Sequence, residues 1–220
     1  MRKILVLIVA AALASGCSAA PQADGSAPTA LPATQSPPAT TPAVSSGTKA
    51  PIALGSLRLQ SRWWTWASAT ETRNPVLDTT GGLCGNGQPD DIWLVAGSFG
   101  GKVSRKCNWP AERPLVGPVV NLVDTEQGCR TFLANATGSV TFDGRPVPVQ
   151  RLEAENIRFT AEADNPSGFD PGPLKGVACG LWFAVPGSTI GKHTLVIRGK
   201  SGDFATEATY NLIGHMAEAF

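Results

Sequence analysis

Short hydrophobic runs, separated by glycine and proline, fill residues 51–220 and restrict this part of the chain to strand-rich folds. The clearest signal is Val140–Val149, in which two alternating runs flank the dipeptide Asp143-Gly144. Asp-Gly is favoured in two-residue hairpin turns because both of its residues tolerate the positive φ angles that such turns need. We therefore predict a β-hairpin over Val140–Val149.

A second hairpin is predicted near the C-terminus, with Thr194–Arg198 and Phe204–Leu212 as its strands and Gly199–Gly202 as its turn. Its second strand places four hydrophobic side chains on one face with a period of two: Phe204, Ala208, Tyr210 and Leu212. Further strands are expected at Ile92–Ser98, Lys102–Asn108, Leu115–Val123, Asn156–Ala163 and Ala178–Val185. This rhythm predicts an all-β domain, a mainly antiparallel sandwich of jelly-roll or immunoglobulin-like type, with room for one short helix.

The segment Leu59–Ala69 does not follow the strand rhythm. It contains Trp63, Trp64 and Trp66, and it fits a short helix that packs its tryptophans on a sheet about as well as it fits a strand. Periodicity does not decide between helix and strand in so short an apolar segment. Both structures remain open for this segment.

Residues 1–16 have the order of an export signal. A positive start, Met1-Arg2-Lys3, precedes the apolar run Ile4–Leu13 and the small residues Ala14–Gly16. The apolar run is shorter than the roughly 20 residues that a permanent membrane helix needs. With Cys17 directly after it, the segment resembles the lipobox of bacterial lipoproteins, although Leu13 lies one position further upstream than the usual leucine. The resemblance implies cleavage before Cys17 and acylation of its thiol, which would anchor the mature chain to a membrane.

The segment 18–50 is predicted to be a disordered tether. Proline, serine, threonine and alanine dominate it, it has no aromatic residue, and Asp24 and Lys49 are its only charged residues. The expected organisation is a signal peptide over 1–16, a lipidated cysteine with a linker over 17–50, and one domain over 51–220. We expect this domain to be held at the cell envelope and to face the periplasm or the exterior.

Four cysteines remain once Cys17 is assigned to lipid, an even number in an oxidising compartment. Two disulfides are therefore expected, and three connectivities are possible. Pairing Cys84 with Cys107 and Cys129 with Cys179 closes the shorter loops and is the connectivity that we favour. Zinc is not expected, because no Cys-x-x-Cys pair occurs and the two histidines are not spaced as ligands.

Several motifs of the domain resemble a family of secreted bacterial β-rich proteins of unassigned function. The motifs are Trp63–Ala67, Asn74–Gly81, Ile92–Gly101, Arg105–Pro110, Val140–Gly144, Gly191–Leu195 and Thr209–Leu212. The resemblance covers most of the domain, and it implies a single β domain with a cysteine pair at 84 and 107. It implies no activity.

The tryptophans are the first candidates for a binding role. The chain has 6 of them, and flat aromatic faces bind sugar rings by apolar stacking. Trp109, beside Pro110, is expected to be the most exposed, and Trp63 and Trp64 are the other candidate ligand-binding residues. Core packing is the alternative role for each of these side chains.

Catalytic and metal sites find weaker support in the sequence. Glu153 and Glu155, two residues apart, would share a strand face and could serve as an acid and base pair, with Asp78 or Asp90 near the first disulfide. No Gly-x-Ser-x-Gly motif occurs. Oxygen-rich loops at 86–91 and 164–170 could bind calcium, but they lack the spacing of an EF-hand, and turn formation explains their composition.

The formal net charge is +1, and beyond the signal no cluster of Lys and Arg indicates nucleic-acid binding. We therefore expect a non-enzymatic, envelope-anchored binding or structural module without a cofactor or metal, and with a cell-wall or extracellular glycan as the leading ligand class. Two alternatives remain: a hydrolase of envelope polysaccharide, and an adaptor or inhibitor of another envelope protein. The sequence does not predict the oligomeric state.

Overall fold

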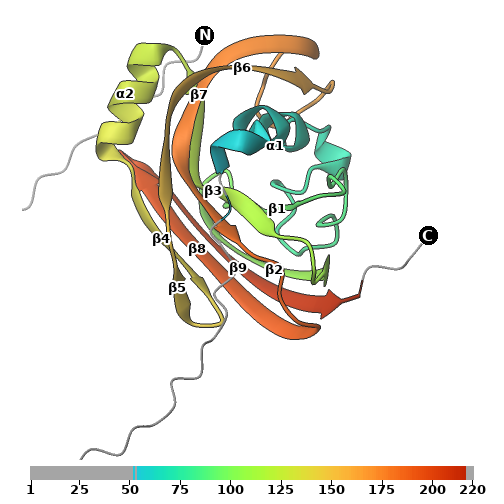
Figure 1. The fold of residues 1–220 in the computed structure, drawn as a ribbon. Coiled ribbons are helices and arrows are strands. Elements are labelled where there is room, and N and C mark those ends of the chain that lie inside the picture. Colours follow the sequence, from blue (N-terminus) through green and yellow to red (C-terminus); the bar gives the residue numbers. More distant parts are fainter. Residues whose placement is uncertain (1–51, 53, 217–220) are drawn as a thin grey trace, which may run out of the picture. The chain divides into compact units, whose positions relative to one another are not determined.

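The computed structural model describes residue 52 and residues 54–216. The predicted signal peptide, Cys17 and the tether lie outside the described residues. Within the described part the chain is mostly β, with two sheets, so the predicted fold class is confirmed. Figure 1 shows the strands curving around α1 (Leu59–Ala67), which lies on their inner side.

One sheet has four strands in the order β1-β3-β7-β6, and the other has five in the order β2-β9-β8-β4-β5. The strands are β1 (Trp93–Leu94), β2 (Gly101–Pro110), β3 (Leu115–Asp124), β4 (Thr137–Phe142), β5 (Arg145–Val147), β6 (Gln150–Ala161), β7 (Gly172–Val185), β8 (Gly191–Ser201) and β9 (Phe204–His215). Most neighbouring strands are antiparallel, as predicted. Two pairs, β1 with β3 and β2 with β9, are parallel, which the sequence did not predict.

The tryptophan-rich segment forms the helix α1. Leu59, Trp63 and Trp66 recur at helical spacing and are buried, so the helix turns one apolar side toward the sheets. Short 3₁₀ turns lie on either side of it, at Leu54–Leu57 and Glu71–Arg73.

A second helix, α2 (Glu126–Asn135), was not predicted. The hydroxyl of Thr125 accepts a hydrogen bond from the backbone N–H of Gly128, and Glu126 forms an ion pair with Arg130 one turn later. The helix buries only Cys129 and Leu133, so its sequence has too few apolar positions to stand out from a loop.

Both predicted disulfides are confirmed. Cys84 pairs with Cys107 and links the loop before β1 to β2, and Cys129 pairs with Cys179 and links α2 to β7. All four cysteines are buried.

The two sheets approach each other closely where β3 faces β4 and β8. A Cβ atom at Gly138 would lie 2.3 Å from Cγ1 of Val119, and one at Gly199 would lie 2.4 Å from the carbonyl oxygen of Val119. Glycine is therefore required at both positions for β3 to pack this closely.

A buried arginine joins the loop before β2 to the rest of the domain. The guanidinium of Arg105 donates hydrogen bonds to the carbonyl oxygens of Val76, Asp78, Ala96 and Gly97 and to the hydroxyl of Tyr210, at 2.7–3.0 Å. That hydroxyl donates in turn to the carbonyl oxygen of Ala96. The expected strand Ile92–Ser98 ends at Leu94, because the carbonyl groups that follow bind side chains instead of a neighbouring strand. The carbonyl oxygen of Val95 accepts from Nε1 of Trp63, and those of Ala96 and Gly97 accept from Arg105.

The first predicted hairpin is confirmed as β4 and β5, and its turn is attached to β8. Asp143 and Gly144 have φ angles of 50° and 76°, as the turn requires. The carboxylate of Asp143 accepts a hydrogen bond from the backbone N–H of Thr194 and bonds to Nδ1 of His193 at 2.7 Å.

Burial alone would lower the pKa of His193, but its hydrogen bonds to Asp143 and Thr189 outweigh burial and raise it. Burial would also raise the pKa of Asp143, but hydrogen bonds from His193 and Thr194 lower it.

We expect Arg105→Met to lower the free energy of unfolding by about 3–5 kcal/mol, because the backbone carbonyl groups that now bind the guanidinium would stay buried without a donor. Tyr210→Phe removes only one hydroxyl and should lower it by about 1–3 kcal/mol. Denaturant unfolding followed by tryptophan fluorescence measures both changes. An Arg105→Met variant as stable as the wild type would contradict the role given to this side chain.

We expect the stability lost in Asp143→Asn to depend on pH. The raised pKa of His193 contributes stability below the ordinary histidine pKa, and this contribution disappears as pH rises through the raised value. The lowered pKa of Asp143 contributes above the ordinary aspartate pKa. The loss should therefore be larger at about pH 5.5 than at about pH 8.5. The control Asp203→Asn, in the other hairpin turn, should show no such difference.

Candidate functional site

The expected exposure of Trp109 is wrong. Its side chain is 0% exposed, its Nε1 donates to the carbonyl oxygen of Arg113, and its ring meets Phe142 and His193 edge to face. Trp109 is buried because β2 pairs with β9. This pairing places its side chain on the face of the five-stranded sheet that packs into the hydrophobic core. Trp109 therefore offers no face to a sugar ring in this conformation.

Trp63 and Trp64, the other two candidates, lie side by side on α1 with their rings at 88°. Trp63 is buried, and its Nε1 donates to the carbonyl oxygen of Val95. Trp64 is half-buried against Phe159 and Phe169. Both rings border the same pocket.

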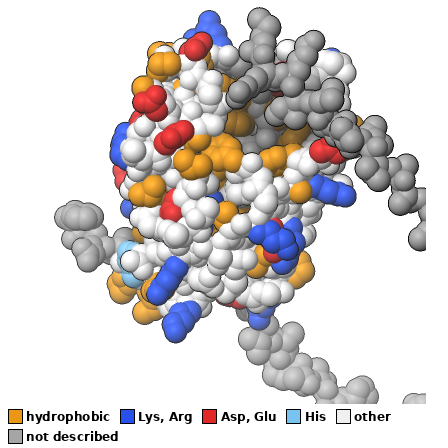
Figure 2. Space-filling model, turned by 180° about the vertical axis from the view of Figure 1, so that it is seen from behind, with side chains coloured by type: hydrophobic (Ala, Val, Ile, Leu, Met, Phe, Trp, Pro, Cys, Tyr) orange, Lys and Arg blue, Asp and Glu red, His pale blue; other side chains and the backbone are white. Residues whose placement is uncertain are grey.

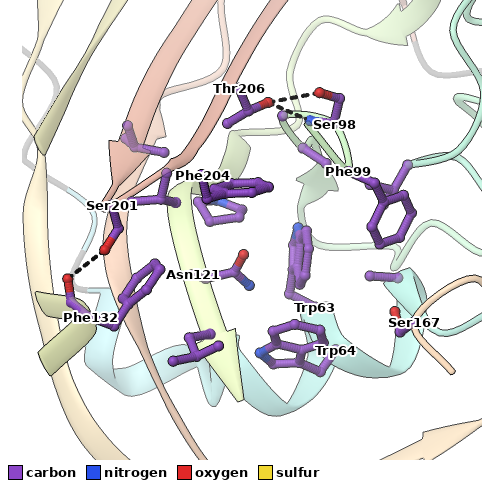
Figure 3. Close-up of a pocket in the computed structure, with 18 residues that line it drawn as sticks. Trp63, Trp64, Ser98, Phe99, Asn121, Phe132, Ser167, Ser201, Phe204 and Thr206 are labelled. Atoms are coloured by element: carbon purple, nitrogen blue, oxygen red, sulfur yellow. Dashed lines mark hydrogen bonds between the residues drawn. The ribbon is translucent and has the colours of Figure 1, made fainter. Parts of the chain in front are cut away.

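This pocket, which we call the α1 pocket, has a volume of about 350 Å³. It lies between α1, β3 and the ends of β8 and β9, and Figure 3 shows its lining. The larger hydrophobic lining residues are Trp63, Trp64, Val76, Phe99, Val119, Val120, Leu122, Phe132 and Phe204. Small ligand sites in proteins typically have volumes of about 300–1,000 Å³ and are mostly apolar, so size and lining both fit a small ligand.

The α1 pocket has no ionisable side chain among the described residues that line it. Its 18 lining residues include no Asp, Glu, Lys, Arg, His, Cys or Tyr. Two of them, Phe99 and Phe204, are 47% and 39% exposed, so an apolar surface continues from the pocket to the outside of the molecule. The lining therefore supplies apolar contact and neutral hydrogen-bonding groups, but no acid, base or charged nucleophile.

Some of the neutral polar groups in the lining already have partners. Ser98 and Thr206 bond to each other through their hydroxyl oxygens at 3.0 Å, and the hydroxyl of Ser201 donates to the carbonyl oxygen of Phe132. Both contacts are drawn in Figure 3.

Other polar groups in the lining lack partners. Among the described residues, 6 buried side-chain nitrogen or oxygen atoms have no hydrogen-bond partner, and three of these atoms belong to the pocket: Nε1 of Trp64, Nδ2 of Asn121 and Oγ of Ser167. Buried polar groups in proteins are usually paired, and each unpaired one calls for an explanation.

Glu153 and Glu155, the carboxylates considered as an acid and base pair, bond to different neighbours. A bulge between Leu152 and Glu155 breaks the two-residue alternation of β6. Glu155 accepts a hydrogen bond from Gln60 of α1, whereas Glu153 pairs with Arg151, which also binds the carbonyl oxygen of Leu133 in α2.

Asp78, the carboxylate expected near the first disulfide, serves its own loop. Burial would raise the pKa of Asp78, but hydrogen bonds from the backbone N–H groups of Leu83, Thr80 and Gly81 lower it. Asp90, the alternative, is exposed.

The oxygen-rich loops use their amide side chains internally. Gln88 bonds to the backbone of Cys84 and Leu94, and Asn165 bonds to the backbone of Glu162 and Phe169. Within residues 52 and 54–216, no group of three or more His, Cys, Asp or Glu side chains is arranged to hold a metal ion.

Among the helices of the described residues, none has the length and hydrophobicity needed to cross a membrane.

Acidic, basic and hydrophobic side chains are interspersed on the face shown in Figure 2. Exposed ion pairs such as Lys102–Glu207 and Arg198–Glu207 join opposite charges on neighbouring strands.

Sequence reasoning missed most of the α1 pocket. One local signal was available, since Asn121 is the only amide in the otherwise apolar run Leu115–Val123. Phe99, Ser167 and Phe204 carry no such signal, because they reach the pocket from separate loops and strands.

Comparisons of this chain with protein-family models, with curated proteins and with solved structures found no significant match.

Proposed function

We propose that this domain is a non-enzymatic binding module of the cell envelope that takes a small apolar molecule into the α1 pocket. The observation that supports this proposal is the pocket's lining, which is aromatic and aliphatic and contains no ionisable side chain. Burial of an apolar ligand there is favourable at roughly 25 cal/mol per Å² of apolar surface removed from water.

A small apolar ligand fits the geometry better than a glycan. Sugar rings stack on exposed aromatic faces, whereas five of the six tryptophans are at most 7% exposed and Trp64 is half-buried. A glycan also needs several hydrogen-bonding groups at its binding surface, and the α1 pocket has few that are not already paired.

A hydrolase is supported less well. His193 and Asp143 resemble part of a catalytic triad, but the second ring nitrogen of His193 bonds to the carbonyl oxygen of Thr189 at 2.9 Å. Both ring nitrogens therefore have structural partners. Glu153 and Glu155 bond to different neighbours, which argues against a shared acid and base pair.

The proposed place of action follows from the N-terminal sequence. A lipid on Cys17 would hold the mature chain at the membrane, and the tether would let the domain face the periplasm or the exterior. An apolar ligand suits this location, because the membrane beside the domain is a source of such molecules. An envelope protein is a further possible partner, through the exposed rings of Phe99 and Phe204.

We expect Leu122→Trp to weaken the binding of a neutral, environment-sensitive apolar dye by about tenfold or more, since the larger ring would fill the α1 pocket. The matched control is Leu77→Trp, at an exposed leucine outside the lining. It should bind the dye like the wild type. Dye titration, with melting temperatures to confirm folding, measures this effect. Equal dye binding by both variants and the wild type would contradict a site in this pocket.

We expect the mature protein from bacterial membranes to carry acyl groups on Cys17, detectable by intact-mass analysis. Cys17→Ala should move the protein from the membrane fraction to the soluble exported fraction, because the lipid is its proposed anchor. An unmodified Cys17 in the mature protein would refute the anchor and leave the ligand proposal standing.

A further inference from the structure

Asn121 is the polar residue of the α1 pocket whose position calls for an explanation. It lies on β3 within a run of apolar residues, and Figure 3 shows its amide extending from the strand toward Trp63 and Trp64. Its Nδ2 is buried and has no hydrogen-bond partner among the described residues. A leucine at this position would leave no buried polar group unpaired, so we expect the amide to lower the stability of the unliganded protein.

Trp64 indicates which kind of group could pair with the unpaired polar atoms of the α1 pocket. Its Nε1 is also buried without a partner among residues 52 and 54–216, and an indole N–H only donates. The two ring systems of α1 and the amide of Asn121 border one cavity, whereas Ser167 lies on the other side of Trp64 in Figure 3. A ligand that pairs with Trp64 and with Nδ2 of Asn121 must offer a hydrogen-bond acceptor.

The absence of charge in the lining restricts that acceptor further. An ionised carboxylate or phosphate in the α1 pocket would be buried with no opposite charge among the 18 lining residues, which is strongly unfavourable. A neutral carbonyl oxygen meets both requirements. Most of the remaining lining is apolar and suits a hydrocarbon chain. The volume of about 350 Å³ is near the lower end of ligand-site volumes, which favours a single chain.

Building on the proposed function, we infer that the α1 pocket selects a neutral ester or amide with a single hydrocarbon chain. Its carbonyl oxygen accepts hydrogen bonds from Asn121 and Trp64, and its chain lies against the aromatic and aliphatic lining. Asn121 is thus a binding residue that lowers the stability of the free protein and gains its partner from the ligand.

The test uses the mature chain with Cys17→Ala and three probes of equal chain length: methyl decanoate, decane, and decanoate ionised at about pH 8. Displacement of the neutral apolar dye measures their affinities. The wild-type pocket should bind the ester about tenfold more tightly than the ionised acid, and more tightly than decane. Asn121→Leu should weaken ester binding by about tenfold, leave decane binding unchanged, and raise the melting temperature of the unliganded protein.

Trp64→Phe keeps an aromatic ring and removes the N–H, so it should also weaken ester binding selectively. The matched controls are Asn211→Leu on the exposed side of β9, and Trp66→Phe, whose N–H is bound to Asn86 outside the pocket. Both should keep the preference for the ester.

The outcomes separate the two proposals. If neither the dye, the ester nor decane binds the wild type, the proposed binding function is overturned. If the dye and decane bind but the ester has no advantage, or if Asn121→Leu affects ester and decane alike, the binding function stands and the inference about the ligand's carbonyl group is overturned. A lower melting temperature for Asn121→Leu would likewise overturn it, since it would show that the amide stabilises the fold.

Discussion

The guanidinium of Arg105 is the interaction on which the arrangement of this domain most depends. It is fully buried, and it binds four backbone carbonyl groups and one hydroxyl that come from two loop segments and from β9. These loop segments have few strand contacts of their own, so the arginine replaces the ladder hydrogen bonds that they lack. Tyr210 strengthens the arrangement, because its hydroxyl binds Ala96 and its ring lies 5.2 Å from the guanidinium carbon.

The same interaction shapes the α1 pocket. Val76, Ala96 and Gly97, whose carbonyl groups bind Arg105, also line the pocket, so the arginine holds one wall in place. Another wall is β3, which the glycines at 138 and 199 allow to approach the second sheet. Walls that are held by such contacts before a ligand arrives would lower the free-energy cost of the binding that we propose.

Local patterns in the sequence predicted much of the fold. The Asp143-Gly144 turn, the alternation in β9 and the apolar runs of β3 and β7 depend on backbone preferences and on side chains near in sequence, and they appear in the structure. The disulfide connectivity followed from loop length. The helix α2 escaped prediction because its few apolar positions gain their burial from β7 and Cys179, which are distant in sequence.

The candidate site is where prediction from sequence failed most clearly. Trp109 beside Pro110 has the local character of an exposed ring, yet the pairing of β2 with β9 buries it completely. Asn121 and Trp64 are 57 positions apart, and only the packing of α1 against the curved sheets brings them to one cavity. The sequence alone determined the strand-rich class and the hairpin turns, because local backbone and side-chain preferences control them, and it favoured the cysteine pairing that the structure has, because that pairing closes the shorter loops. The tertiary structure decided which aromatic rings are exposed and where polar groups lack partners, since burial depends on contacts between distant parts of the chain.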